Sequence, residues 1–313
     1  MMLSTTAERL YWSGRYLERA ENTARLVRVN TDIILDLPVS IGNFWQHIVT
    51  VVGSEERYDS IYDDYNERNV VKYMLADQRN PGSLSASVHM ARENLRTTRE
   101  VMPSASWVAI NRFHLYSEEN VSKAITRKNR DAFLERVVDH CHQFRGIVEG
   151  MMSRSDAYQF LNLGRSIERA DMTTRLLDVA SAQYLDKSQE LDDAFQNALW
   201  MNILQSCSAH QMYIQNVKDT VNGKNALEFL LLDNEFPRSV IYTLSRIISL
   251  ATQLPHNDDV LRSVAQVSRT VANANTSEII QGDLHQYLDS LQLSLSNIHG
   301  EIEKTWFTFD QAK

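Results

Sequence analysis

A charged motif that occurs twice holds the side chains best suited to chemistry. Residues 14–26 (GRYLERAENTARL) match residues 164–176 (GRSIERADMTTRL) without a gap, and eight of the 13 positions are identical. Glutamate can act as a general acid or base, and the planar fork of arginine grips a carboxylate or phosphate with two hydrogen bonds. Glu18 and Glu168 are therefore candidate catalytic residues. The ligand-binding candidates are the arginines of both copies: Arg15, Arg19, Arg25, Arg165, Arg169 and Arg175.

On a helix, the charged residues of each copy share one stripe with apolar residues. In the first copy Glu18 and Arg25 lie within about 80° of Arg15, on the same side as Tyr11 and Leu26. A solvated charged face would not be interleaved with apolar side chains in this way. We therefore expect both stripes to be at least partly buried, with their charges paired.

Two interpretations of these charges remain open. In the structural one, the glutamates form ion pairs between the two helices: Glu18 with Arg165 or Arg169, and Glu168 with Arg15 or Arg19. In the functional one, the same charges line a central polar cavity that binds an anionic or amide-bearing ligand.

A carboxylate-bridged metal pair is a third interpretation, which the ligand types disfavour. Such centres in helical bundles take Glu-x-x-His from two helices. Here Glu18 and Glu168 are followed three residues later by Glu21 and Asp171, and none of the nine histidines stands three residues after a glutamate. We expect no metal site.

A second repeated element has the pattern Asp-x3-Pro-x-Ser. It occurs at Asp77, Pro81 and Ser83 and again at Asp233, Pro237 and Ser239. Proline in a first turn with polar residues nearby is typical of a helix start, whereas the alternative is an anion site at two helix N-termini. For that alternative the candidate ligand-binding residues are Asp77, Ser83, Asp233 and Arg92.

The elements that must position these residues are helices. Apolar residues recur with helical periodicity, and no segment alternates like a strand between turn signals. We expect long helices over 5–36 and 155–185, a tyrosine-rich surface loop over 54–66, and shorter helices over 41–52, 67–75, 83–101, 104–117, 129–152, 190–217, 225–232, 238–253, 257–273 and 277–306. The predicted class is all-α: a helical bundle, one compact domain over 1–313, built from two duplicated units (about 1–150 and 151–313) related by a pseudo-twofold axis.

Composition excludes several classes of protein. Only 10 glycines and five prolines occur in 313 residues, which argues against folds with many short loops. A net charge of −8 argues against nucleic acid or anionic membrane as a partner. Two cysteines without a CxxC motif, and no apolar leader at the start, lead us to expect a cytoplasmic protein.

Three stretches of the chain resemble the bacterial alpha-E family, an all-helical domain of unknown function named for its Glu-Arg motif. They are MLSTTAERLYWSGRYLERAENTARL, NPGSLSASVHMARENLR and LGRSIERADMTTRLL. The family motif falls on Arg15, Glu18, Arg19, Asn80, Pro81, Ser83, Arg92, Glu93, Asn94, Arg165, Glu168 and Arg169. Gly82 departs from the pattern, since a larger residue is expected before Ser83.

The resemblance implies association with a circularly permuted ATP-grasp protein and a transglutaminase-like protein, systems that resemble amide- or peptide-ligating machinery. Our leading hypothesis is a partner or substrate-binding subunit that takes a peptide or amino acid and meets ATP only through its partner, with no cofactor of its own. The alternatives are a stand-alone enzyme that uses the Glu-Arg helices for acid–base chemistry on a peptide, amino acid or amine, and a purely structural helical scaffold.

Overall fold

A computed structural model describes residues 2–36, 44–185 and 193–308, and all regular structure in these ranges is helical. The first half contains α1 (Ser4–Asp36), α2 (Phe44–Val51), α3 (Glu55–Asp59), α4 (Glu67–Leu75), α5 (Leu84–Arg96), α6 (Ser104–Ala124) and α7 (Arg127–Met151). The second half contains α8 (Asp156–Leu185), α9 (Asp193–Ser206), α10 (His210–Val217), α11 (Gly223–Leu232), α12 (Val240–Ala251), α13 (Asp258–Ala272), α14 (Thr276–Gln281) and α15 (Leu284–Ile302). The predicted all-α class is confirmed.

Three predicted elements are corrected by the structure. The segment 54–66 is not simply a surface loop, because it contains α3 and buries Tyr58 against other tyrosines. The predicted helix 190–217 is broken after α9, where Ser208 has a left-handed φ of 52°. The predicted helix 277–306 is divided at Gly282, and Asp283 starts α15 anew by accepting a hydrogen bond from the Gln286 N–H at 2.8 Å.

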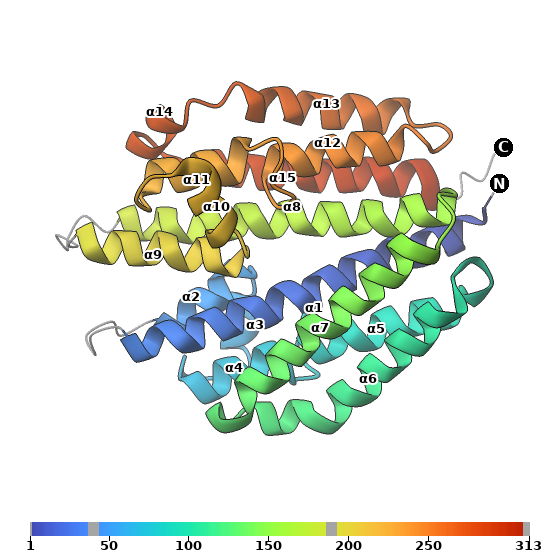
Figure 1. Ribbon diagram of the computed structural model, residues 1–313, viewed down its shortest axis with the longest axis horizontal. Coiled ribbons are helices and arrows are strands. Elements are labelled where there is room, and N and C mark those ends of the chain that lie inside the picture. Colours follow the sequence, from blue (N-terminus) through green and yellow to red (C-terminus); the bar gives the residue numbers. More distant parts are fainter. Residues whose placement is uncertain (1, 37–43, 186–192, 309–313) are drawn as a thin grey trace.

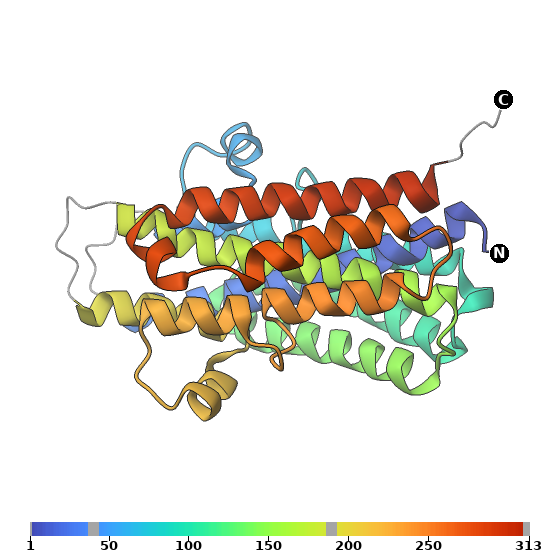
Figure 2. The ribbon, with the colours of Figure 1, turned by 90° about the horizontal axis from the view of Figure 1, so that it is seen from above.

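The two long helices α1 and α8 lie against each other at the centre, and each carries its own set of helices (Figure 1). Helices α5 and α7 pack on α1, with α6 outside them; α12 and α15 pack on α8, with α13 outside them. Figure 2 shows the start of α1 and the end of α15 at the same end of the bundle. The two sets follow the same chain order, as the predicted duplication requires, but the pseudo-twofold axis itself stays a prediction.

Two glycines let the central helices touch backbone to backbone. A Cβ atom at Gly14 would lie 1.9 Å from the carbonyl oxygen of Leu161, and one at Gly164 would lie 1.9 Å from that of Tyr11. The contact is reciprocal, because Gly164 and Leu161 are the matched positions of Gly14 and Tyr11. Only glycine permits this approach, so the paired glycines set the distance at which the Glu-Arg side chains meet.

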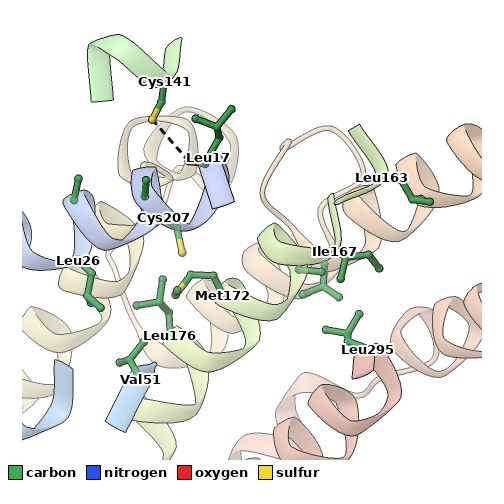
Figure 3. Packing of buried hydrophobic residues seen from close by; sticks show 14 of the residues in the cluster. Leu17, Leu26, Val51, Cys141, Leu163, Ile167, Met172, Leu176, Cys207 and Leu295 are labelled. Atoms are coloured by element: carbon green, nitrogen blue, oxygen red, sulfur yellow. Dashed lines mark hydrogen bonds between the residues drawn. The ribbon is translucent and has the colours of Figure 1, made fainter. Parts of the chain in front are cut away.

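A continuous apolar core runs between the two sets of helices. Figure 3 shows Leu17 of α1 beside Cys141 of α7, and Leu176 of α8 beside Val51 of α2. The thiol of Cys141 on α7 donates to a carbonyl oxygen of α1, with 3.7 Å between sulfur and oxygen. The charged motif is therefore embedded in a packed apolar interface. Among the described helices, none is long and apolar enough to cross a membrane.

Candidate functional site

Glu168 is clamped by two arginines from the facing helix. Arg15 Nε donates to Glu168 Oε2 at 2.7 Å, while Arg19 donates through Nε to Oε1 at 2.5 Å and through Nη2 to Oε2 at 3.0 Å. The two arginines are one turn apart on α1, so both reach the same carboxylate on α8. The predicted pairing of Glu168 with Arg15 or Arg19 is confirmed, and both partners are used.

Glu18 is held in the same way from the other side of the interface. Arg169 donates through Nε to Glu18 Oε1 at 2.7 Å and through Nη2 to Oε2 at 2.9 Å. Of the two predicted partners, Arg169 is confirmed. Arg165 forms its ion pair elsewhere, 3.6 Å from Glu149 at the end of α7.

The second cation on Glu18 is Arg238, which the sequence analysis did not identify. Its buried guanidinium donates to Glu18 at 3.0 Å, to Asn22 Oδ1 at 2.9 Å and to Glu21 at 2.6 Å. One signal was present in the sequence: the matched Pro-x-Ser turns carry arginine in one copy and Gly82 in the other.

Glu21 also belongs to the network, although the sequence analysis did not propose it as a site residue. This buried carboxylate accepts hydrogen bonds from Arg25 at 2.9 Å, from Arg145 of α7 at 2.5 Å and from Arg238. Arg25 also lies 3.1 Å from His142. The residue that matches Glu21 in the second copy is Asp171, which within the described part of the chain has one arginine partner, Arg175, through a 2.9 Å hydrogen bond. The two halves of the network therefore differ in the number of arginines around this carboxylate.

Electrostatics keep both central glutamates ionised. Burial opposes the charged form, but Arg19 and Arg15 outweigh it and lower the pKa of Glu168 to about 2. Arg169 and Arg238 likewise outweigh burial and lower the pKa of Glu18. Two arginines of the network have lowered pKa values. Burial and the neighbouring Arg169 lower the pKa of Arg165 to about 10, and burial lowers the pKa of Arg169.

The network opens to the surface on the Glu168 side, in a cleft of about 280 Å³ that we call the Gly82 cleft. Its floor comes from α1 and α8, and its wall comes from the turn before α5 and the segment after α2. The charged residues that line it are Arg15, Arg19, Arg57, Arg175, Glu168 and Asp171. Four cations face two carboxylates, so the cleft has a surplus of positive charge.

The turn after α2 lets Arg175 reach this cleft. Gly53 ends α2 with a φ of +60°, a conformation that glycine adopts without strain. A Cβ atom there would lie 2.7 Å from Arg175 Nη1, so a side chain would push the guanidinium away. Gly53 thus serves both the turn and the placement of Arg175.

A second, smaller cavity lies on the Glu18 side of α1. It measures about 30 Å³ and is lined by Glu18, Glu21, Cys141, Arg145 and Arg165 among others. That volume admits about one water molecule. It is too small to bind an organic substrate.

A partly buried row of side chains leads from α15 to the Glu168 clamp. Tyr11 lies beside Arg15 and its hydroxyl is 2.8 Å from His299 Nδ1, while His299 Nε2 lies 3.4 Å from Glu303. Burial and then Arg15 lower the pKa of His299, so its ring is neutral near pH 7. Sequence spacing held no signal for this contact, because 288 residues separate the first two members.

The remaining candidates lie outside the cleft. Ser83 and Ser239 cap α5 and α12 by accepting from backbone N–H groups at 3.3 and 3.2 Å, which confirms the helix-start interpretation, although both prolines precede the first helical turn. Asp77 accepts from Arg79 and Tyr62, and Asp233 accepts from two backbone N–H groups of its own turn.

Arg92 also lies away from the cleft, at the contact between α5 and α6. It donates to Asn111 at 2.9 Å and lies over the ring of Trp107. In the described ranges, no group of three or more His, Cys, Asp and Glu side chains is arranged to hold a metal ion.

Comparison with known proteins places the chain in a family. Residues 2–307 match Alpha-E, described as a predicted alpha-helical domain with a conserved ER motif. Uncharacterized proteins of Mycobacterium bovis (strain ATCC BAA-935 / AF2122/97) and Mycobacterium tuberculosis (strain CDC 1551 / Oshkosh) are each 24% identical over 265 residues. The match covers 79% of this chain and only 29% of each relative. No solved structure matches the chain. Because the family match spans nearly the whole sequence and includes both Glu-Arg segments, the chain belongs to the Alpha-E family.

Proposed function

We propose that the chain is the substrate-binding partner subunit of an ATP-grasp-type amide- or peptide-ligation system. The observation that supports this most directly is the Gly82 cleft, where the Glu-Arg network of the core meets the surface. Arg15 and Arg19 are held by the buried Glu168 and Arg175 is held by the half-buried Asp171, so the donors of these arginines are oriented before a ligand arrives. The ligand would be a peptide or amino acid, and ATP would be bound by the partner.

A binding role fits this site better than stand-alone acid–base catalysis. Both oxygens of Glu168 already accept hydrogen bonds from arginines. With its pKa near 2, the carboxyl group holds no proton to donate at neutral pH. A general acid or base works best with a pKa near the working pH. We therefore assign Glu18 and Glu168 the role of positioning residues, which orient the arginines.

A purely structural scaffold accounts for the buried ion pairs but not for an open, cation-rich cleft above them. The relatives point in the same direction, because the matched segment is 29% of their length and is thus joined to further chain. In these relatives the matching helical domain is one part of a longer chain, which is consistent with a domain that acts together with other protein segments. A transglutaminase-like protein is a further proposed partner.

Co-purification tests the proposal. The chain with an affinity tag is co-expressed with an ATP-grasp protein encoded beside it, and ADP release is measured with each protein alone and with the mixture, in the presence of a peptide pool. We expect a stable complex and ADP release that requires both proteins. ADP release from the chain alone, or no complex and no effect of the chain on turnover, would contradict the proposal.

A further inference from the structure

The two Pro-x-Ser turns differ at their middle residue. This residue decides whether a side chain fills the space between the turn and the Glu-Arg network. Arg238 stands between Pro237 and Ser239 as Gly82 stands between Pro81 and Ser83. We propose that the Gly82 cleft is the single ligand site of the chain, that it binds an oxyanion, and that the side chain of Arg238 fills its counterpart. Identifying the oxyanion as a substrate carboxylate rests on the proposed function.

The surroundings of the two turns correspond residue by residue. At the filled site, Arg169 donates to the carbonyl oxygen of Pro237 at 3.3 Å and Thr173 donates to that of Arg238 at 3.0 Å. The matched α1 residues Arg19 and Thr23 line the Gly82 cleft together with Pro81. The cleft is therefore the same place in the other half, without the arginine side chain.

At the Gly82 cleft, which is the open site, Glu168 obtains its second arginine without a side chain from the turn. At the filled site Glu18 takes its second arginine from the turn, through Arg238. At the open site Arg15, from α1 itself, takes that place on Glu168. The Glu168 carboxylate is thus fully paired while the space above it stays open, so a cationic ligand finds no unpaired carboxylate there.

The cleft offers donors to an anion instead. Arg15 and Arg175 reach their carboxylates through Nε, which leaves their Nη groups out of these two ion pairs. Arg57 is exposed at the rim and has no ion pair within the described part of the chain. Arginines from three segments line the cleft, and the planar guanidinium group suits a carboxylate or phosphate. A volume of about 280 Å³ suits one or two amino-acid residues rather than a larger ligand.

Calorimetric titration with defined probes tests the site. The probes are N-acetyl-Glu-Glu, its fully amidated analogue and inorganic phosphate. We expect the dipeptide to bind with one molecule per chain and the amidated analogue at least tenfold more weakly. Phosphate binding without dipeptide binding overturns the carboxylate assignment, and two equivalent dipeptide sites per chain overturn the role given to Arg238.

Variants connect the binding to the cleft. Gly82→Arg places the side chain of the filled site in the open one and should abolish dipeptide binding. Gly82→Ala is its matched control, because a Cβ atom there meets only Asn80 Oδ1, at 3.3 Å. Arg57→Gln removes a rim cation and should weaken binding about tenfold, whereas Arg269→Gln, an exposed arginine on α13, should leave it within twofold.

Circular dichroism checks that Gly82→Arg is folded. If the folded variant still binds the dipeptide as well as the parent chain does, the inference is overturned. It is also overturned if the parent chain binds none of the probes. This failure is distinct from failure of the proposed function. If the chain activates an ATP-grasp partner but Gly82→Arg binds the dipeptide normally, only the proposed site is refuted. If the cleft binds the dipeptide but the chain forms no complex with an ATP-grasp protein, only the proposed function is refuted.

Discussion

Glu18 and Glu168 lie inside the protein, and each receives charged hydrogen bonds at both carboxylate oxygens. Removing such a group from water costs several kcal/mol, which is recovered only when its partners are well placed. The penalty for losing one partner is therefore larger than the net contribution of the pair. This asymmetry makes the network sensitive to single neutral substitutions.

Replacing Glu168 with glutamine should lower the free energy of unfolding by about 3–5 kcal/mol. The amide keeps the volume of the side chain but leaves Arg15 and Arg19 buried without a counter-charge. Urea denaturation of the variant beside the parent measures the change. Glu135→Gln, at an exposed position on α7, is the control and should change stability by less than about 0.5 kcal/mol. Equal stability of Glu168→Gln and the parent would mean that water or a rearrangement compensates the arginines.

The same pair predicts a dependence on pH. The ordinary pKa of glutamate is about 4.3, and in the folded protein that of Glu168 is about 2, against the effect of burial and because of Arg19 and Arg15. A lowered pKa stabilises the fold above pH 4–5, and this contribution disappears as the pH falls through 2. The stability gap between the parent and Glu168→Gln should narrow by about 3 kcal/mol between pH 5 and pH 2. A gap that stays constant over this range, measured by urea denaturation, would show that the pKa of Glu168 is the same in the folded and unfolded states.

At the scale of elements, the spacing of α1 and α8 is set by backbone rather than by side chains. Gly14 and Gly164 each bring the opposite helix to a distance that no other residue tolerates. The clamps on Glu18 and Glu168 lie one turn further along the same helices. A wider separation would lengthen every one of these charged hydrogen bonds.

Gly14→Ala and Gly164→Ala should therefore each destabilise the protein by about 1–3 kcal/mol or more, since overpacked backbone cannot relax like a flexible side chain. Thermal unfolding followed by circular dichroism measures the effect. Gly146→Ala is the matched control, because it lies inside helix α7 and a Cβ atom there meets nothing within 4 Å. It should stabilise the protein by up to about 1 kcal/mol, since alanine is the better helix former. Similar effects at all three glycines would refute the close approach.

At the scale of the whole molecule, two sets of helices enclose one charged interface. In the part of the chain that the structure describes, its Glu168 side opens as a cleft of about 280 Å³, whereas the cavity on its Glu18 side measures about 30 Å³. Figure 1 shows α1 and α8 running side by side through the bundle, each covered by its own helices. The chain as a whole carries a net charge of −8, so the cation-rich cleft is a local exception on an acidic protein. Such a contrast attracts an anionic ligand to one place.

The isolated chain should not bind ATP tightly. Its sequence contains no glycine-rich phosphate loop, and the Gly82 cleft is at the lower end of the size range of small-molecule sites. Isothermal titration of ATP into the chain without a partner should give no submicromolar affinity. An affinity in that range would place the nucleotide on this chain and remove the reason for an ATP-grasp partner.

Much of the architecture could be predicted from the sequence, because helical periodicity is a local property. The charged stripes of α1 and α8, their burial and the pairing of each central glutamate with arginines of the facing helix follow from residue types at repeated spacing. The errors lie where periodicity continues across a break, as at Ser208, or where a short helix buries an aromatic residue, as at Tyr58. Both depend on a few backbone angles that the apolar pattern does not record.

Only the tertiary structure decided which of two matched places is filled. The sequence contains both glutamates and both turns, but Arg238 reaches Glu18 across 220 residues. Whether Glu18 pairs with Arg165 or Arg169 depends on the relative register of two helices, since both arginines lie on the same stripe one turn apart. The Gly82 cleft exists where α1, α8, the segment after α2 and the turn before α5 meet and glycine supplies no side chain. The volume and charge of the cleft therefore depend on how the helices pack, and the sequence determines them only through the folded structure.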